Sequence, residues 1–322
     1  MLLIVTNRAD PHADEVIRRL HANNIAVFRL NTEGITSDYQ ISLNVDSVGN
    51  WNGLIVDELG RELILSKLKV AWIRRPEVAF GKPIDGISRF ILSEVKALLA
   101  CLYSIPTITF INENFDAARA KTKFQQLIHA SQAGVRVPRT IITNSPEAAA
   151  AFVKESASAL IVKSVYTSNF DHEATKHGVF SRKISSKDLL EKIDLVANCP
   201  TQIQDYIDKQ FELRVTVIGE RAFAVKIDSQ ANDLTKVDWR KFTLINPHSV
   251  FELPKRISDF CVEFIRGQKL VYGAIDFIVD NNDDFIFLEN NPSGQYLWLE
   301  ELTGVDITGE LVRLVADIVV CG

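Results

Sequence analysis

The sequence has few of the features that mark membrane, secreted or nucleic-acid-binding proteins. No apolar run approaches the roughly 18 residues of a membrane-spanning helix. The opening residues MLLIVTNRAD are apolar for too short a stretch for a signal peptide, so we interpret them as a first strand. A net charge of -5 disfavours nucleic acids and anionic membranes as partners.

Metal-binding and disulfide patterns are also missing. No CxxC pair occurs among the four cysteines, which are scattered at Cys101, Cys199, Cys261 and Cys321. This spacing is typical of reduced thiols in a cytoplasmic protein. The six histidines form no HxxxH pair, so a histidine-based transition-metal site is not expected.

The 322 residues instead read as a globular protein of two or three domains, with 47% hydrophobic and 24% charged residues. Strand and helix signals alternate in the first third. Strands are predicted at 2–6, 25–30, 54–56, 70–75 and 107–112, with helices after Asp10-Pro11 and across residues 90–102. This alternation predicts an N-terminal α/β domain over residues 1–113 with a largely parallel sheet.

The remaining chain divides into a central part and a strand-rich end. For residues 114–200 we predict helices at 116–133, after Ser145-Pro146 and at 186–197, a strand at 159–165, and a polar loop or hairpin at 166–180. For residues 201–322 we predict strands at 201–207, 212–218, 221–228, 271–279 and 285–291, and helices at 255–268 and 306–320. This C-terminal part is predicted to be α+β with an antiparallel sheet.

An acidic hairpin, VYGAIDFIVDNNDDFIFLENN, is the clearest chemical signal. If its turn centres on Asn282-Asp283, Asp276 lies directly across from Glu289, and Asn291 shares a sheet face with Glu289. Opposed carboxylates repel each other, and a divalent cation removes that repulsion. A set of oxygen ligands suits Mg²⁺. The alternative is a solvated sheet face with incidental acids, and a register shift of one residue would break the geometry.

Two lysines lie where a positive charge is unfavourable without a partner. Lys163 is inside the apolar strand ALIVKSV, so it needs an acid or a bound anion, unless it reaches water at the strand end. Lys121 lies near a helix start, where a cation is unfavourable unless it serves an anion there. Taken alone, a lysine such as Lys121 is more often an ordinary solvated charge.

The segment from QDYI to ELRV offers groups for a nucleoside. The backbone of Asp205, Tyr206 and Ile207 enters a linker with free polar groups that could read an adenine edge, and Glu212 could take ribose hydroxyls. Arg214, in an apolar strand, is a candidate for bidentate phosphate contact. Structural salt bridges explain any one of these residues about as well.

Taken in order, the motifs resemble the ATP-grasp superfamily over the last two thirds of the chain. They read Lys121, Lys163, QDYI, ELRV, Lys226, GAIDF and LENNPSGQ. The resemblance is closer still to the microviridin-type peptide ligases, or graspetide synthetases, through AWIRRPE, QIQDYIDKQFELRVTVIG, AVKIDSQ, DWR and ENNPSGQYLWLE. It implies an ATP-grasp fold with an N-terminal pre-ATP-grasp domain, a central domain and a C-terminal domain.

Mapped onto this sequence, the resemblance implies a role for each motif residue. ATP would contact Lys121, Lys163, Gln204, Asp205, Tyr206, Ile207, Glu212 and Lys226, and Mg²⁺, as two ions, would be held by Asp276, Glu289 and Asn291. Catalytic contacts would come from Arg214, Arg240, Arg74 and Arg75. The sequence departs from the family pattern at two places, and both bear on the substrate rather than on ATP binding. The linker reads Gln-Asp where related linkers often read Gln-Glu, and the end reads GQYLWLE where related ligases often have Trp directly after Gln.

The resemblance also implies an activity: ATP-dependent joining of Asp or Glu side chains of a ribosomally made precursor peptide to Thr or Ser hydroxyls or Lys amines, through acyl phosphates. The precursor would carry a leader, which docks near residues 166–197, and an acidic, Thr-rich core, and the enzyme would be a cytoplasmic homodimer. Two alternatives stay open: an ATP-grasp ligase that adds an amino acid to a peptide or protein tail, and a non-catalytic nucleotide-binding module. A nucleic-acid binder is disfavoured by the acidic charge.

Overall fold

A parallel sheet organises the N-terminal part of the computed structural model, which describes residues 1–77, 85–166, 169–172 and 175–321. The strand order is β2-β1-β6-β7, with every neighbouring pair parallel. The strands are β1 (Leu2–Thr6), β2 (Val27–Asn31), β6 (Val70–Ile73) and β7 (Thr109–Ile111). The predicted parallel sheet is therefore confirmed.

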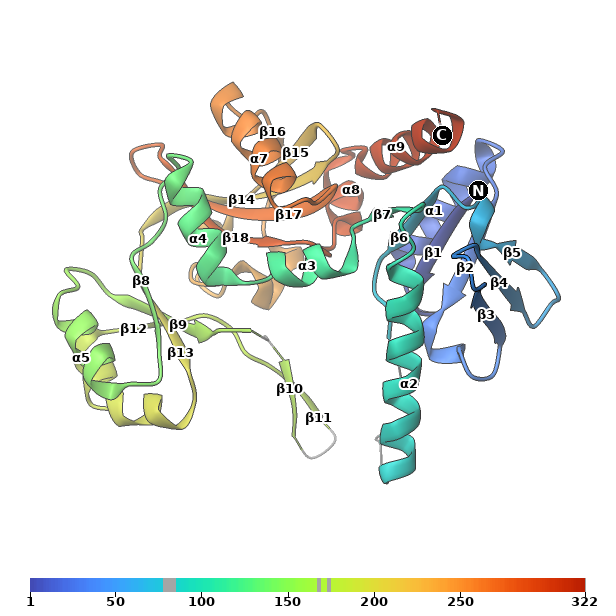
Figure 1. Ribbon diagram of the computed structural model, residues 1–322. Coiled ribbons are helices and arrows are strands. Elements are labelled where there is room, and N and C mark those ends of the chain that lie inside the picture. Colours follow the sequence, from blue (N-terminus) through green and yellow to red (C-terminus); the bar gives the residue numbers. More distant parts are fainter. Residues whose placement is uncertain (78–84, 167–168, 173–174, 322) are drawn as a thin grey trace.

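Helices cover both faces of this sheet, which explains why β1 is apolar throughout. Leu2 and Ile4 pack against α1 (Pro11–Ala22) and α9 (Ile307–Cys321), whereas Leu3 and Val5 face α2 (Gly86–Tyr103). Asp10 caps α1, as predicted, by accepting a hydrogen bond from the backbone N–H of His12. Helix α9 ends the chain yet lies beside α1, so the C-terminus completes the core of the N-terminal part (Figure 1).

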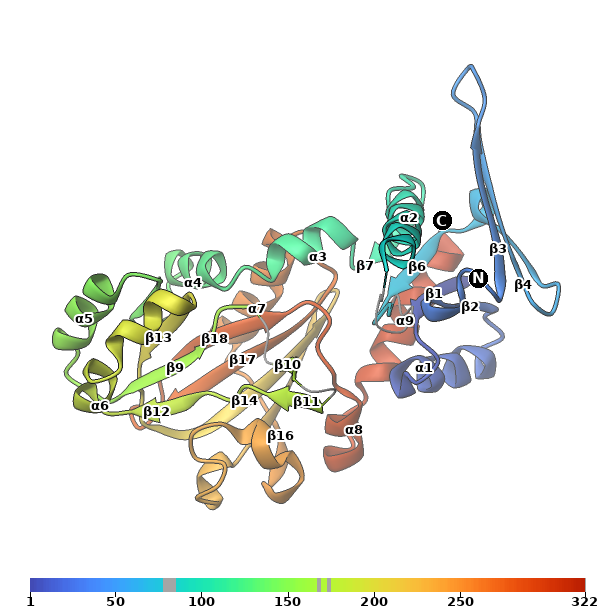
Figure 2. The same cartoon turned by 90° about the horizontal axis from the view of Figure 1, so that it is seen from below.

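A second, antiparallel sheet extends this part beyond the prediction. Strands β3 (Tyr39–Val45), β4 (Trp51–Asp57) and β5 (Glu62–Ile64) form it in sequence order. The β3–β4 hairpin projects away from the body of the molecule (Figure 2). Strand signals in this region are weak because every residue of β3 is partly or fully exposed.

Two helices stand where one was predicted over 116–133. Helix α3 (Asn114–Ala120) ends at Lys121, and α4 (Lys123–Gln132) begins after Thr122. Gly134, with φ of 77°, follows α4 in the left-handed conformation that its glycine signal predicts. The break changes which lysine begins a helix, because Lys121 caps the end of α3 while Lys123 opens α4.

The central sheet is antiparallel, in the order β12-β9-β13-β8. Its strands are β8 (Thr140–Thr143), β9 (Leu160–Ser164), β12 (Arg182–Ile184) and β13 (Thr201–Asp205). One face packs on α5 (Pro146–Lys154), α6 (Ser186–Leu190) and the 3-10 segment Ile193–Asn198. A hairpin of β10 (Asn169–His172) and β11 (Thr175–Gly178) leaves this sheet, as one of the two predicted forms of 166–180; residues 167–168 and 173–174 lie outside the described residues.

The C-terminal sheet is the predicted antiparallel one, in the order β16-β15-β14-β17-β18. Its strands are β14 (Lys209–Ile218), β15 (Arg221–Ile227), β16 (His248–Phe251), β17 (Tyr272–Asp280) and β18 (Phe285–Asn291). Phenylalanines and aliphatic residues of one face pack against α4 and α7 (Lys255–Gly267). The other face is turned toward the central sheet, and α8 (Leu297–Thr303) follows β18.

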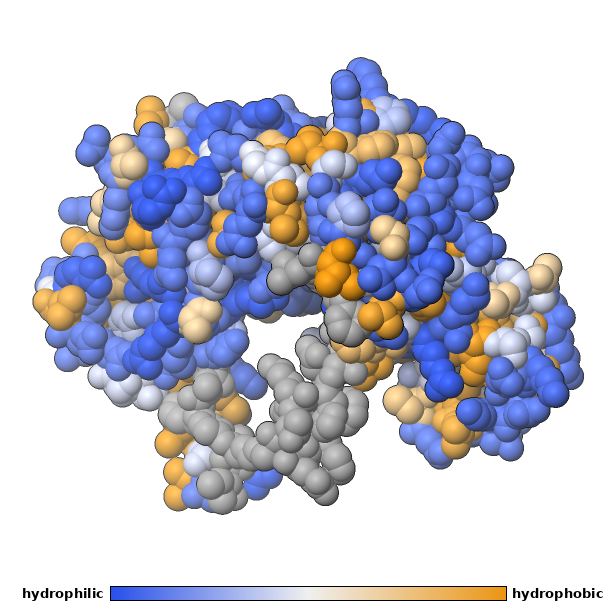
Figure 3. Space-filling model, turned by 180° about the vertical axis from the view of Figure 1, so that it is seen from behind, coloured by the Kyte–Doolittle hydropathy of each residue, from blue (hydrophilic) through white to orange (hydrophobic). Residues whose placement is uncertain are grey.

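Short 3-10 segments complete the chain at Thr32–Gly34, Leu65–Lys67, Ser229–Ala231 and Trp239–Ile245. On the face turned away from the viewer of Figure 1, hydrophilic side chains predominate and hydrophobic ones form scattered groups (Figure 3). Across the described ranges, no helix is long and apolar enough to cross a membrane.

Candidate active site

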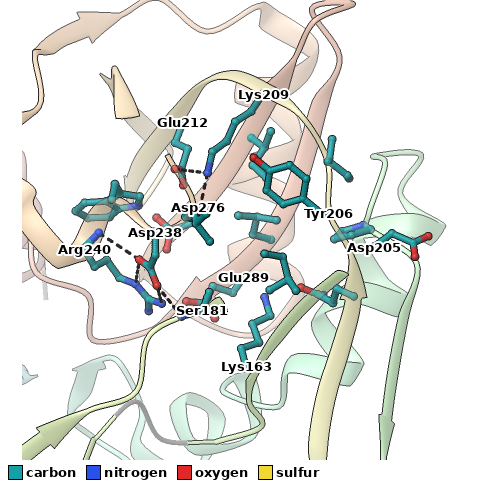
Figure 4. Close-up of a pocket in the computed structure, with 18 of the residues that line it drawn as sticks. Lys163, Ser181, Asp205, Tyr206, Lys209, Glu212, Asp238, Arg240, Asp276 and Glu289 are labelled. Carbon is teal, nitrogen blue, oxygen red and sulfur yellow. Dashed lines mark hydrogen bonds and ion pairs between the residues drawn. The ribbon is translucent and has the colours of Figure 1, made fainter. Parts of the chain in front are cut away.

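A cavity lies between the central sheet and the C-terminal sheet, and it gathers most of the predicted site residues (Figure 4). The ones that line it are Lys163, Gln204, Asp205, Tyr206, Ile207, Glu212, Arg240, Asp276 and Glu289. They come from strands more than 100 residues apart in sequence. The fold therefore brings together groups that the sequence only suggested as a series.

One end of this cavity offers neutral polar groups and one carboxylate. The Gln204 amide donates to Thr140 Oγ1 at 2.8 Å, and in the described part of the chain the backbone N–H of Ile207 has no hydrogen-bond partner. The Asp205 side chain turns away toward Arg139 (Figure 4), so only the backbone of Asp205 can face a ligand. The backbone N–H groups of Asp205 and Tyr206 already donate to the carbonyls of Arg139 and Ala159, so the N–H of Ile207 is the backbone donor that could face a purine base.

Glu212 lies beside this edge and is buried with Lys209. Lys209 Nζ donates to Glu212 Oε1 at 2.6 Å, and both side chains are at most 7% exposed. Burial raises the pKa of Glu212, while the charge of Lys209 acts against that rise. The lysine therefore holds a carboxylate acceptor in a place where ribose hydroxyls could donate to it.

The acidic hairpin pairs as predicted, but by a different route. Asp276 is the direct partner of Glu289. The strand pairing shifts beyond them, with Phe277 opposite Phe287, so Leu288 is an extra residue in β18. Without this β-bulge, Glu289 would share the core face with Phe285 and Phe287; with it, Glu289 and Leu288 both line the cavity. The turn itself centres half a residue earlier than predicted, and the bulge restores the pairing.

Cations surround the two facing carboxylates. Arg214 Nη1 donates to both Asp276 oxygens, at 3.0 and 2.9 Å. Burial raises the pKa of Asp276 against the opposing charge of Arg214. Burial also acts to raise the pKa of Glu289, but Lys123, Lys163 and Arg240 together bring it down to about 2.

The donor set fits a hard divalent cation. Asp276 and Glu289 provide carboxylate oxygens, and Asn291 adds an amide on the same strand as Glu289, with its Oδ1 accepting from the Ser293 N–H at 3.0 Å. Among the described residues no cluster of three or more acidic, histidine or cysteine side chains could hold a metal alone. A bound Mg²⁺ would therefore take further ligands from phosphate and water, as it usually does.

Two lysines that line the cavity approach Glu289. Lys163 faces it from β9, and burial lowers the pKa of Lys163 to about 8 although Glu289 acts to raise it. Lys123 Nζ, at the start of α4, is 3.2 Å from Glu289 Oε2. Two ammonium groups beside a metal-type acid pair form a setting for polyphosphate.

Arg240 closes the inner end of the cavity and is fixed by Asp238. Its Nε and Nη2 donate to the two Asp238 oxygens at 2.8 and 2.6 Å, which raises the pKa of Arg240. Asp238 also accepts from the Ser181 N–H at 3.0 Å (Figure 4). This carboxylate therefore ties the guanidinium to the segment that follows the β10–β11 hairpin.

A second cavity meets the first at Lys123, Arg240 and Glu289, which line both. Its wall otherwise includes the end of β6, α3 and the turn after β18, with Arg75, Lys121 and Asn291. Among the described residues, five basic side chains line this cavity against two acidic ones, Glu77 and Glu289. Such a surface suits an acidic substrate next to the phosphate end of the first cavity.

Six predicted site residues do not line the first cavity. Four of them line the second cavity, Arg214 is buried against Asp276, and Lys226 lies elsewhere; the four are Arg74, Arg75, Lys121 and Asn291. Lys226 lies on the opposite face of the sheet, 4.4 Å from the Phe211 ring, because its partner Leu213 faces the hydrophobic core. Arg74 is only 3% exposed and donates to the Ser293 carbonyl at 2.7 Å, so it lies inside a domain contact. Lys121 is exposed and reaches only the second cavity.

Sequence reasoning missed Lys123, Lys209 and Asp238. Thr122 and Gln125 form the T-x-x-Q pattern typical of a helix start, which would have pointed to Lys123 as a first-turn cation. The Lys209–Glu212 spacing is a common salt-bridge spacing and carries no special signal. Asp238 belongs to the DWR motif, in which only the arginine was assigned a role.

An acid pair and three cations in a cavity between two antiparallel sheets, beside a site for a purine edge, define an ATP-grasp enzyme, an ATP-dependent ligase. A family model described as the RimK-like ATP-grasp domain matches residues 118–315. The match covers well over half of the chain, and the protein belongs to this family.

Solved structures give the same picture over the full length. A RiPP-associated ATP-grasp ligase of Chryseobacterium gregarium, in complex with ADP and a leader and core peptide, is 28% identical over 98% of this chain and 96% of its own, with a TM-score of 0.90. The macrocyclase MdnC of Microcystis aeruginosa MRC, bound with precursor peptide MdnA, is 25% identical over 100% and 99%, with a TM-score of 0.84.

The ATP-grasp ligase PsnB, complexed with precursor peptide PsnA2 and AMPPNP, shares the fold at 22% identity over 99% of this chain and 97% of its own, with a TM-score of 0.78. No curated protein sequence matches the chain. The ATP-grasp fold predicted from the motifs is confirmed, and so is the resemblance to this group of peptide ligases.

Proposed function

We propose that the protein is a peptide macrocyclase that joins Asp or Glu side chains of a ribosomally made precursor peptide to Thr or Ser hydroxyls or Lys amines of the same peptide. The observation that carries this proposal is the junction of the two cavities at Glu289. On one side lie groups suited to a nucleotide, and on the other a cationic surface suited to an acidic peptide. The Chryseobacterium ligase, which is described with ADP and with leader and core peptides, supports it.

In the first step, a peptide carboxylate oxygen attacks the γ-phosphorus of ATP, and ADP leaves. The adenine would lie along Gln204 and Ile207, the ribose at Glu212, and the phosphates at Lys163 and Lys123. We assign the phosphate contact to Lys123 rather than Lys121 because only Lys123 lines the first cavity. Mg²⁺ at Asp276, Glu289 and Asn291 would offset the charge of the phosphates.

In the second step, a hydroxyl or amine of the peptide attacks the carbonyl carbon of the acyl phosphate, inorganic phosphate leaves, and the nucleophile loses a proton. Arg214 and Arg240 stabilise negative charge on the transferring group. Arg75 and Lys121 hold acidic side chains of the peptide at the second cavity. Val179 and Ser181 line the first cavity and would help to exclude water, which would hydrolyse the acyl phosphate; a cover formed by the whole segment 166–184 stays a prediction. Two Mg²⁺ ions, a homodimer, a cytoplasmic location and leader docking near residues 166–197 stay predictions.

Mass spectrometry of a reaction with ATP, Mg²⁺ and an acidic, Thr-rich precursor peptide tests the proposal. Ring formation lowers the peptide mass by one water per ring and releases one ADP each time. A mass gain of one glutamyl residue, which is glutamate less one water, when free glutamate is supplied, would instead identify a tail-adding ligase. Nucleotide binding with no ADP release for any carboxylate offered would point to a non-catalytic module.

A further inference from the structure

The turn Pro292–Leu297, which joins β18 to the first residue of α8, receives several of its hydrogen bonds from residues of the N-terminal part. Asn112 donates from one amide to two carbonyls, at 2.7 Å to Tyr272 and at 2.9 Å to Pro292. Arg74 donates to the Ser293 carbonyl at 2.7 Å. Asn112 and Arg74 are both at most 4% exposed. This turn directly follows Asn291, so the N-terminal part is clamped onto the end of the candidate metal hairpin.

His12 forms the other half of the clamp. Its Nε2 accepts hydrogen bonds from the backbone N–H groups of Tyr296 and Leu297, both at 3.1 Å. A ring nitrogen that accepts two N–H groups carries no proton, so the proton of neutral His12 is on Nδ1, 3.5 Å from Asp10 Oδ1. The ring is 3% exposed and stands edge-on to the Tyr296 ring.

Among the described residues, the only hydrogen bond of the Arg74 side chain is the one to the turn. Its Nε and Nη2 are buried without a hydrogen-bond partner, and its Nε is 4.0 Å from Asp10 Oδ2. Thr6 and the backbone of His12 hold Asp10 in turn, at 2.6 and 3.1 Å. A buried guanidinium is costly unless its charge is balanced, so Asp10 keeps Arg74 aimed at Ser293.

Gly294 of the turn lies in close contact with Arg214, a residue of the candidate active site. A Cβ on Gly294 would lie 2.5 Å from Arg214 Nη2 and 2.4 Å from the Ala274 Cβ, so only glycine fits against this guanidinium. The Tyr272 hydroxyl donates to the Gly294 carbonyl at 2.6 Å and fixes its position. Arg214 is 7% exposed and has its opposite edge on Asp276. The turn therefore packs against the Arg214 guanidinium and sets its orientation toward Asp276.

We propose that His12 and Arg74 are positioning residues for the ligase reaction, which act by holding the Pro292–Leu297 turn so that Gly294 aligns Arg214 with the reacting groups. This inference rests on the proposed function for its kinetic consequence, but not for its structural one. The inference gives the N-terminal part a role in the reaction, although His12 and Arg74 do not line the first cavity. A displacement of about 1 Å at a reacting centre can lower a rate by about 100-fold.

A double-mutant cycle between His12→Ala and Arg214→Lys tests this inference. Alone, His12→Ala should lower kcat by about 10- to 100-fold, while the Kd for ADP with Mg²⁺ changes by less than about twofold. In the Arg214→Lys background, His12→Ala should lower kcat by less than about threefold, because the residue through which His12 acts is already altered. His12→Gln, whose amide oxygen can accept the two N–H groups, should recover most of the rate.

His21→Ala is the matched control, since His21 is an exposed residue of the same helix and should leave kcat unchanged. Equal losses of kcat for His12→Ala in the parent and Arg214→Lys backgrounds would overturn the inference, as would an unchanged kcat. If His12→Ala does not fold, Arg74→Met takes its place in the cycle. The side-chain N–H resonance of Arg214, assigned by its loss in Arg214→Lys, should shift in His12→Ala; an unchanged resonance refutes the inference even if the parent proves to have no ring-forming activity.

Discussion

The clearest test of the site is a matched pair of lysine variants, Lys123→Met and Lys121→Met. The two lysines are two residues apart, and methionine keeps the chain length while it removes the charge. Lys123 opens α4 and lines the first cavity, 3.2 Å from Glu289. Lys121 ends α3, is exposed, and lines only the second cavity. Because Lys123 lines both cavities and Lys121 only the second, the difference between the two variants reports on the first cavity.

The expected magnitude follows from the contact that Lys123 would make. Loss of one charge-assisted hydrogen bond to a phosphate costs about 1.5–3 kcal/mol, or about 10- to 150-fold in Kd. Protonation of Glu289 does not contribute at neutral pH. The pKa of Glu289 is about 2, and Lys163 and Arg240 still hold it down when Lys123 is removed. Lys121→Met should change nucleotide affinity by less than about twofold, because a solvated charge contributes little to binding.

Calorimetric titration with ADP and Mg²⁺ measures both affinities, and thermal melting followed by circular dichroism checks that each variant is folded. Lys121→Met should instead raise KM for the acidic peptide, since Lys121 faces the second cavity. If Lys121→Met weakened ADP binding as much as Lys123→Met, the break between α3 and α4 would not decide which lysine contacts the phosphates. The phosphate contact would then belong to Lys121, as the sequence motif implied.

Three further outcomes are expected. Glu289→Gln should abolish ADP release in the coupled enzyme assay and leave the melting temperature near that of the parent; turnover near the parent rate would remove Glu289 from the metal site. Lys209→Met should weaken ADP binding about tenfold by leaving Glu212 buried without its cation, whereas Lys226→Met, on the other face of the sheet, should not, and equal effects in titration would contradict that assignment. Burial lowers the pKa of His12, so folding favours its neutral form and the free energy of unfolding should fall as pH drops below about 6.5, at up to ~1.4 kcal/mol per pH unit; His12→Gln should show a shallower dependence in urea titrations, and identical slopes would argue against a buried neutral ring.

Local patterns of the sequence were sufficient for much of the fold. The continuous apolar run at residues 2–6 predicted a first, buried strand, and α1 and α2 cover β1 on its two faces. Glycine at 134 marked the end of α4. What local patterns could not supply was the return of α9 to the N-terminal sheet, because that contact depends on packing between residues 300 positions apart. Strand signals were weak or absent at β3 and β16, because the residues of both strands are partly or fully exposed.

A site residue was predictable where the alternation of side chains along its own strand decides which face of the sheet it lies on. Glu212 and Asp276 face the cavity as expected. Lys226 does not, because pairing with Leu213 puts it on the core face, and pairing is a non-local property. Arg74 and Arg75 looked alike in sequence, yet the first is buried against Ser293 and only the second is exposed at the second cavity. Neighbouring residues at a strand end diverge according to what the rest of the fold places beside them.

The extra residue at Leu288 puts the two halves of β18 out of phase. Residues 285, 287, 289 and 291 are all odd-numbered, yet the first two belong to the phenylalanine core and the last two to the acidic end. Loop length in this hairpin can therefore vary at the Asn282 end without moving the carboxylate. Deletion of Leu288 alone would rotate Glu289 into the aromatic cluster. An alignment or redesign of β18 therefore has to treat the residues before Leu288 and those after it as two segments with separate registers.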